Sequence, residues 1–360
     1  MEPAELAGRL ASAGPEERAS LLAGHEAIVD LRLARALKAL YDETESSDPS
    51  RAAGATAALA DVARAVDDQE ASALAAWTTG MVALDAGRME AAIGHLEDAE
   101  ARFMALGQRH SAAATQVSKV IALAILGRYH EALHCGLTAR DLFLEHGDIL
   151  AAGKIEQNLG NIYFRRDYYA EAERYYRSAR ERFVAIGDQK QLVQIGNCLG
   201  TALTTQHKFR SAAPIYEEAL RRAEQVGLAV TQAELEGNLG CLALSQGAYD
   251  EALDYLERSR RGFAALGMGS RSATAEQELA DTYLDLNLAP EAVSIYTRIV
   301  PIFADLGMRA EHAHALAYSA RAHLLLGQIE VARSLLAEAR PLYVAEGSPV
   351  GEAMVALVEA

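Results

Sequence analysis

Residues 147–187 read GDILAAGKIEQNLGNIYFRRDYYAEAERYYRSARERFVAIG, and the pattern of this segment returns every 40 residues along most of the chain. A glycine stands at positions 107, 147, 187, 227, 267, 307 and 347, and an alanine stands at 92, 132, 172, 212, 252, 292 and 332. An aromatic residue stands at 103, 143, 183, 263, 303 and 343. A unit that recurs at a fixed period stacks on copies of itself, because one unit alone cannot bury its apolar face.

Each repeat is predicted to contain two helices. Apolar side chains recur at helical spacing in two runs of the quoted segment, first Ile155, Leu159, Ile162 and Tyr163, then Ala172, Tyr176, Ala179 and Phe183. Gly187 follows the second run and suits the left-handed residue after a helix. No alternating strand pattern occurs in the sequence. We therefore expect an all-α protein, an α-solenoid of stacked antiparallel helix pairs.

This layout resembles the tetratricopeptide repeat (TPR) family, whose usual unit is about 34 residues. The matching residues in one repeat are Leu159, Gly160, Tyr163, Ala172, Tyr176 and Ala179. Two repeats later Leu239, Gly240 and Ala252 keep the motif, whereas Ala243, Leu256 and Ser259 depart from it. The resemblance implies a right-handed superhelix, whose concave groove is lined by the first helix of each repeat and holds a protein or peptide segment.

The chain divides into three parts on this interpretation. Residues 1–67 form an N-terminal helical cap with one degenerate repeat, residues 68–347 form seven TPR-like repeats, and residues 348–360 begin a further, interrupted repeat. The apolar segment 352–358 is too short to form a stable helix alone. Two explanations of this segment stay open: it docks on the last repeat, or the natural protein continues past Ala360.

Composition limits the classes of partner. The net charge is −16, so an acidic chain of this kind repels nucleic acid and anionic lipid, and neither is an expected partner. The sequence shows no signal segment and no run of 18 apolar residues, and its three scattered cysteines are typical of reduced thiols. These features favour a cytoplasmic protein, and the repeat style favours a bacterial one.

Arginines gather in one repeat, at positions 165, 166, 174, 177, 180 and 182, with Glu171, Glu173 and Glu181 between them. Pairing of these opposite charges on a solvated helix surface is one explanation. A patch that binds an acidic partner is the other.

Catalytic and metal-binding patterns are weak. His130 and His134 are four residues apart beside Cys135, a spacing that could hold zinc, but the neighbouring Ala132 and Leu133 belong to the core pattern. The sequence contains no nucleophile elbow and no phosphate-binding glycine loop. We therefore expect no enzyme activity in this chain, no cofactor and no metal site.

The resemblance to TPR proteins also implies which side chains face a ligand, because these come from set positions of the first helix. The candidates with polar side chains are Lys154, Gln157, Asn161, Arg165, Gln194, Asn197, Thr201, Thr205, Gln277 and Asp281. Asn161 matches the ligand-facing amide of peptide-holding TPR proteins, whereas Thr201, Cys241 and Asp281 replace it in later repeats. Asn158 and Asn238 could instead bond within the helix stack.

Two functions of different class follow. One is a non-catalytic scaffold that binds a protein or peptide segment in the groove. The other is a regulatory or sensor arm of a larger protein, because residues 83–92 and the general style resemble the repeat arm of bacterial TPR-CHAT proteins. The caspase-like protease would then be an effector domain beyond residue 360, and the reading frame after Ala360 distinguishes the two functions.

Overall fold

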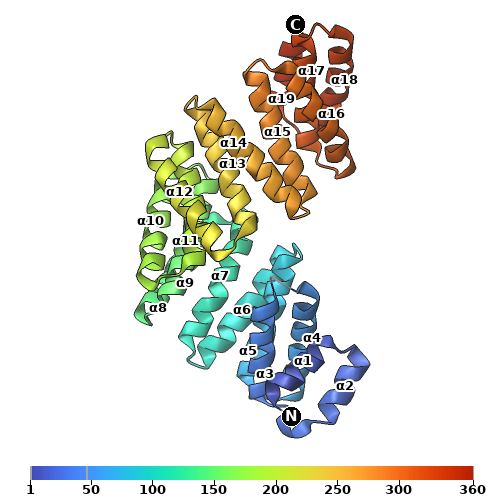
Figure 1. Ribbon diagram of the computed structural model, residues 1–360. Helices are drawn as coiled ribbons and strands as arrows, with labels where there is room; N and C mark the ends of the chain where they lie inside the picture. The colour runs from blue at the N-terminus through green and yellow to red at the C-terminus, as the bar shows by residue number, and fades with distance from the viewer. Residues whose placement is uncertain (1, 46–47, 360) are drawn as a thin grey trace. The chain divides into compact units, whose positions relative to one another are not determined.

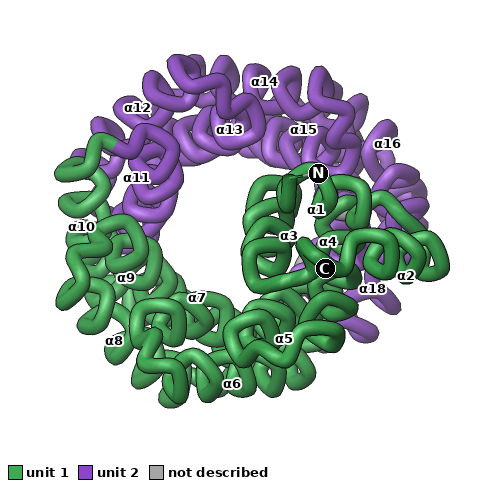
Figure 2. The backbone as a smooth tube through the Cα atoms, turned by 90° about the horizontal axis from the view of Figure 1, so that it is seen from below, with its two compact units in different colours: residues 1–187 green, residues 188–360 purple. Residues whose placement is uncertain are grey.

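The computed structural model describes residues 2–45 and 48–359, which form two compact units, residues 1–187 and 188–360 (Figures 1 and 2). Helices joined by short turns make up nearly all of these residues, and no strand occurs among them. The prediction of an all-α solenoid is confirmed. No helix in the described part of the chain combines the length and apolarity needed to cross a membrane.

Unit 1 begins with four helices and a short 3-10 turn, and continues with three helix pairs. The first elements are α1 (Pro3–Ser12), α2 (Pro15–Ala23), η1 (Glu26–Ile28), α3 (Leu31–Thr44) and α4 (Pro49–Ala65). The pairs are α5 (Gln69–Asp85) with α6 (Met89–Ala105), α7 (Arg109–Ile125) with α8 (Tyr129–Glu145), and α9 (Ile149–Arg165) with α10 (Tyr169–Ile186).

Unit 2 holds four helix pairs and a final helix. The pairs are α11 (Gln189–Thr205) with α12 (Phe209–Val226), α13 (Ala229–Ser245) with α14 (Tyr249–Ala265), α15 (Gly269–Asp285) with α16 (Ala289–Asp305), and α17 (Arg309–Leu325) with α18 (Ile329–Ala345). The last helix, α19 (Pro349–Glu359), packs on α17 and α18, with Val355 fully buried. Helices α5 to α18 are the fourteen helices expected for the seven repeats.

The recurring small and aromatic side chains form the core between helices. Phe103, Phe143, Phe183 and Phe303 are at most 1% exposed, and Phe263 is 6% exposed, as predicted. The recurring alanines are buried as well, from Ala92 onward. Small residues let the two helices of a pair approach closely, and the aromatic rings fill the remaining space at interior density.

The turns between helices from α5 to α19 share one backbone conformation. Eleven glycines have φ between 60° and 74°, among them Gly87, Gly107 and Gly127. Asp167, His207 and Asn287 take the same left-handed conformation, with φ of 62°, 57° and 64°, at the turn inside a repeat. A side chain strains the backbone in this region, whereas glycine adopts it readily.

Replacing His207 by glycine is therefore expected to raise the free energy of unfolding by about 0.5–1 kcal/mol, because the strain of a left-handed residue with a side chain is removed. Gly127→Ala is the reverse change at the matching turn and should lower it by about 1 kcal/mol. Urea unfolding of the two variants measures both effects. Equal shifts in the same direction would contradict this account of the turns.

Candidate functional site

From α5 to α16, the first helix of each pair lies on the inner side of its unit, and the second helix lies on the outer side (Figure 2). All ten predicted groove residues lie on first helices: four on α9, four on α11 and two on α15. Lys154, Arg165, Gln194 and Thr205 are exposed, and the other six are half-buried. We call the surface formed by these helices the first-helix face and describe it separately in each unit.

In unit 1 the first-helix face contains a small cavity of about 70 Å³ between α7 and α9. Asn161 and Arg165 line it from α9, as does Asn158, whereas α7 contributes Ile121 and Ile125, which are 37% and 46% exposed. Polar groups on one helix thus face exposed apolar groups on the next. This combination suits a peptide, which presents both amide groups and apolar side chains.

Three of the predicted groove residues bond to a tyrosine of their own repeat. Asn161 Oδ1 accepts a hydrogen bond from the hydroxyl of Tyr176 at 2.8 Å. The oxygens of Thr201 and Tyr216 lie 3.0 Å apart. The hydroxyl of Tyr296 donates to Asp281 Oδ1 at 2.5 Å. His314 Nε2, on the next first helix, lies 2.9 Å from Asp281 Oδ2.

Substitution of Asn161 is therefore expected to affect folding as well as binding. Tyr176 is only 2% exposed, so the loss of Asn161 removes a buried hydrogen bond, which contributes about 0.5–1.5 kcal/mol. The sequence carries a signal for this bond. A tyrosine follows fifteen residues after Asn161, Thr201 and Asp281, whereas Leu256 follows at the same distance after Cys241.

Asn197 bonds to the neighbouring repeat instead. Asn238 Nδ2 on α13 donates to Asn197 Oδ1 on α11 at 2.7 Å, so Asn238 does bond within the helix stack. The hydroxyl of Thr205 donates to the carbonyl of Thr201 at 3.0 Å. Gln277 Oε1 is buried and has no hydrogen-bond partner in the structure. The first-helix face of unit 2 therefore offers separate polar groups and no continuous row of amides.

A larger cavity, of about 440 Å³, opens on the first-helix face of unit 2. Its lining residues are Asn197, Glu234, Gly237, Asn238, Ser259, Phe263, Arg271, Thr274, Ala275 and Glu278. Burial raises the pKa of the Glu278 carboxyl to about 7, and the negative charge of Asp281 adds to the rise. Neither Gly237 nor Glu278 is among the predicted groove residues. Gly237 occupies the repeat position of Gln157, Asn197 and Gln277 but has no side chain, and Glu278 lies outside the ligand-facing positions.

Glu278→Gln is expected to change how stability depends on pH. The pKa of Glu278 is near 7 in the folded protein and about 4.5 in the unfolded chain, so the ionised carboxyl is less stable in the fold than in the unfolded chain. The free energy of unfolding of the wild type therefore falls as pH rises from about 4.5 to 7. At pH 8 the variant should be more stable than the wild type by on the order of 1–3 kcal/mol, and at pH 5 by much less. Urea unfolding at both pH values measures the difference, and a gain that is the same at both would contradict the raised pKa.

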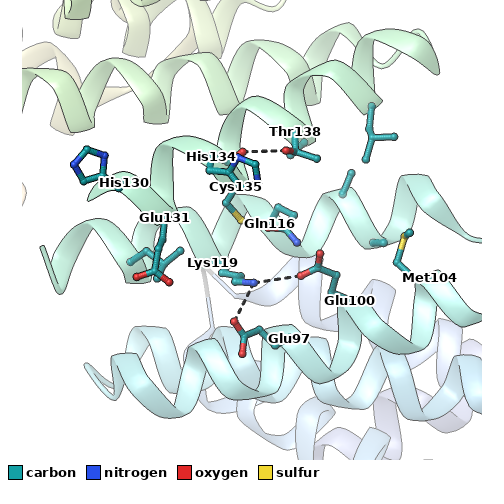
Figure 3. A pocket seen from close by; sticks show the side chains of 15 residues that line it. Glu97, Glu100, Met104, Gln116, Lys119, His130, Glu131, His134, Cys135 and Thr138 are labelled. Carbon is teal, nitrogen blue, oxygen red and sulfur yellow. Dashed lines mark hydrogen bonds and ion pairs between the residues drawn. The ribbon is translucent and has the colours of Figure 1, made fainter. Parts of the chain in front are cut away.

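Another cavity of unit 1, of about 530 Å³, lies on the other side of α7, between α6 and α8 (Figure 3). Lys119 Nζ projects into it and lies 3.1 Å from Glu97 Oε1 and 3.3 Å from Glu100 Oε2. Burial alone lowers the pKa of Lys119, but the hydrogen bond to Glu97 and the nearby negative charges raise it above the ordinary value. Lys119 takes the position that Leu159 occupies one repeat later, and the three repeats after that also hold leucine there, so a cation stands where these repeats have an apolar side chain.

The histidines and cysteine that could have held zinc line this same cavity. The thiol of Cys135 donates to Gln116 Oε1, and burial raises the pKa of this thiol to about 12, so it stays protonated at neutral pH. Zinc binds the thiolate, and this environment opposes its formation. The described residues contain no cluster of three or more potential metal ligands.

The arginine-rich repeat is partly neutralised by its own acids. Arg182 makes two hydrogen bonds to Glu156, at 2.7 and 2.8 Å, and Arg177 bonds to Glu173 at 2.8 Å. The guanidinium of Arg166 lies over the rings of Tyr129 and Tyr168. These contacts favour the first explanation, in which the arginines pair with acidic side chains of their own repeat. They disfavour the second, in which the whole cluster binds an acidic partner.

Family comparisons agree with this architecture. Models described as tetratricopeptide repeat match residues 157–185 and 191–265, which together cover less than a third of the chain. The protein thus contains TPR repeats and has a TPR-like fold. No curated protein sequence matches it significantly.

Solved structures with the same fold include two sensors and a phosphatase. The quorum sensor NprR from B. thuringiensis is 14% identical, with a TM-score of 0.68, over 86% of this chain and 87% of that one. A STAND ATPase with a tetratricopeptide repeat sensor from Pyrococcus horikoshii is 16% identical, with a TM-score of 0.68, over 97% of this chain and 50% of that one. Aspartyl phosphate phosphatase F from Bacillus subtilis is 12% identical, with a TM-score of 0.63, over 98% and 96%. This chain therefore spans half the length of the STAND protein, and at these identities the likeness concerns the fold.

Proposed function

We propose that this protein is a non-catalytic scaffold that binds a protein or peptide segment on its first-helix face. The observation that carries the proposal is the chemistry of that face. It presents exposed polar side chains on consecutive first helices and contains a hollow in each unit, of about 70 Å³ and 440 Å³. Concave surfaces with a few placed polar groups are the usual form of ligand sites.

The exposed members of the face are the ones best suited to bind without supporting the fold. Lys154 and Arg165 offer cationic donors in unit 1, and Gln194 and Thr205 offer an amide and a hydroxyl in unit 2. By contrast, Asn161, Asn197, Thr201 and Asp281 already bond to other side chains of the fold. Binding and folding can therefore be separated experimentally by choosing the first group.

The expected result is that Lys154→Ala with Arg165→Ala, or Gln194→Ala with Thr205→Ala, weakens the binding of a partner by more than tenfold, about 1.4 kcal/mol. The measurement is a quantitative pull-down from native lysate with wild type and each double variant, together with thermal melts. The matched control, Arg88→Ala with Arg174→Ala, removes two exposed cations of unit 1 that lie outside the first helices, one in the turn before α6 and one on α10, and should keep every partner. Recovery of the same partners by all variants at equal yield would rule out the first-helix face.

A second function is favoured by one comparison. The repeats of the STAND ATPase named above are described as a sensor, and this chain covers half of that protein. We infer as an alternative that this chain is the regulatory or sensor arm of a larger protein. More specifically, the effector domain of that protein would be a CHAT protease. The DNA sequence that follows the codon for Ala360 tests the version with an effector domain beyond residue 360, since that domain requires an open frame there.

A further inference from the structure

The cavity in unit 2 lies where a side-chain pair between neighbouring repeats is missing. Asn197 and Asn238 are bonded across α11 and α13, and one repeat later the same two positions hold Gly237 and Glu278. Gly237 has no side chain that could bond to Glu278. No described residue forms a hydrogen bond or ion pair with the Glu278 carboxyl, which nevertheless faces a cavity.

The missing side chain is also what leaves the cavity open. A Cβ placed on Gly237 would point into it, 3.2 Å from Ser259 Oγ and 3.9 Å from Glu278 Oε2. A partner's side chain entering here would therefore occupy the space that a residue 237 side chain would fill. The volume, about 440 Å³, is ample for one long side chain.

The free polar groups around the cavity are mainly acceptors. Glu278 contributes its carboxyl, and Asn238 keeps its carboxamide oxygen free because it bonds to Asn197 through Nδ2. The one cation in the lining, Arg271, is already bound to Glu234 and lies over the ring of Phe263. An entering group should thus carry several donors and a positive charge.

We propose that this cavity binds a basic side chain, arginine or lysine, of the segment held on the first-helix face. The proposal rests on the scaffold function and specifies the chemistry of its partner. The guanidinium or ammonium donates to the Glu278 carboxylate and to the Asn238 oxygen, and the alkyl part of the side chain covers Gly237 and Ala275. A bound cation replaces the absent inter-repeat partner of Glu278.

Charged and titratable groups on the surrounding helices agree with a cation. Helix α13 brings Glu234 and Cys241 to this region, and α15 brings Arg271 and Asp281. Helix α17 contributes His314, which is held on Asp281, whereas α11 and α14 line the cavity with uncharged side chains. Because Glu278 ionises near neutral pH, binding of a basic side chain should strengthen between pH 6 and 8.

The test uses immobilised wild-type protein and synthetic undecapeptide libraries whose central residue is fixed as Arg, Lys, citrulline, Gln or Glu, with the other ten positions random. Citrulline has nearly the shape of arginine without its charge. The expected result is at least fivefold greater retention of the Arg or Lys library than of the citrulline library. This ratio should fall to about one with Glu278→Gln, which removes the charge. It should also fall to about one with Gly237→Asn, which puts at position 237 the same side chain that position 197 carries one repeat earlier, so that its carboxamide lies against Glu278 and fills the cavity.

Asp250→Asn is the matched control, since it removes one exposed carboxylate from α14 outside the cavity, and it should keep the wild-type ratio. Thermal melts confirm that each variant is folded. If the libraries are retained equally whatever their central residue, or if Glu278→Gln keeps the preference, the basic-pocket proposal is overturned and the scaffold function stands. If no library is retained above bare resin, peptide binding itself is contradicted.

Discussion

Replacing Phe183 by alanine should lower the free energy of unfolding of its region by about 3–5 kcal/mol, because a fully buried ring is lost and a cavity remains. Contacts in a repeat array are mainly between neighbours, so the loss should be concentrated in α9 and α10. Hydrogen exchange of residues 149–186, compared with residues in unit 2, measures it. Uniform loss of protection along the whole chain would contradict the nearest-neighbour description, and so would a single cooperative transition.

A second substitution makes this prediction more specific. Gly153 lies against the ring of Phe183, and a Cβ at Gly153 would be 2.5 Å from the ring carbon Cε1. Gly153→Ala alone should therefore destabilise the protein by about 1–3 kcal/mol, although alanine is the better helix former. In the Phe183→Ala background the same methyl enters vacated space and should be neutral or stabilising. Additive effects of the two changes would show that the two side chains do not share this space.

Replacing Arg182 by leucine should have a comparably large effect, about 3–5 kcal/mol of lost stability. Glu156 is 3% exposed and receives two hydrogen bonds from Arg182, so the variant leaves a buried carboxylate without its cation. Urea unfolding at pH 7 is the measurement.

Another repeat of the same chain suggests a control for the Glu156–Arg182 pair. In the last helix pair the corresponding positions hold Leu316 and Leu342, which pack together in an apolar cluster. The double change Glu156→Leu with Arg182→Leu reproduces that arrangement and should recover most of the stability, since an apolar pair can replace a buried ion pair at little cost. A double variant as unstable as the single one would mean that Glu156 does not depend on Arg182.

Most of the fold could be predicted from the sequence because each repeat depends on contacts close in sequence. The same residue type recurs at the same position of each repeat, so the left-handed turns could be predicted from the glycines and the core from the phenylalanines. The structure confirms both predictions. Asp167, His207 and Asn287 interrupt the glycine pattern at the turns, yet the chain keeps the same conformation there. The stacking of neighbouring repeats imposes it against the local preference.

The candidate site was less predictable because it depends on which side chains bond across helices. A polar residue on a first helix looks the same in sequence whether it faces solvent, like Gln194, or bonds to a buried tyrosine, like Asn161. The cavity at Gly237 arises from an absent side chain opposite Glu278, 41 residues later. Such a pair becomes visible only when neighbouring repeats are set in register.

Site-specific photo-crosslinking shows which surface contacts the partner and therefore tests binding on the first-helix face. p-Benzoylphenylalanine is placed in turn at exposed positions of the two helices of a pair, Gln194 on α11 and Glu217 on α12 in unit 2, then Lys154 on α9 and Glu181 on α10 in unit 1. Irradiation with the partner recovered in the pull-down should give adducts from positions 194 and 154 and none from 217 and 181. Adducts from the second-helix positions alone would contradict the account and place the partner on the opposite surface.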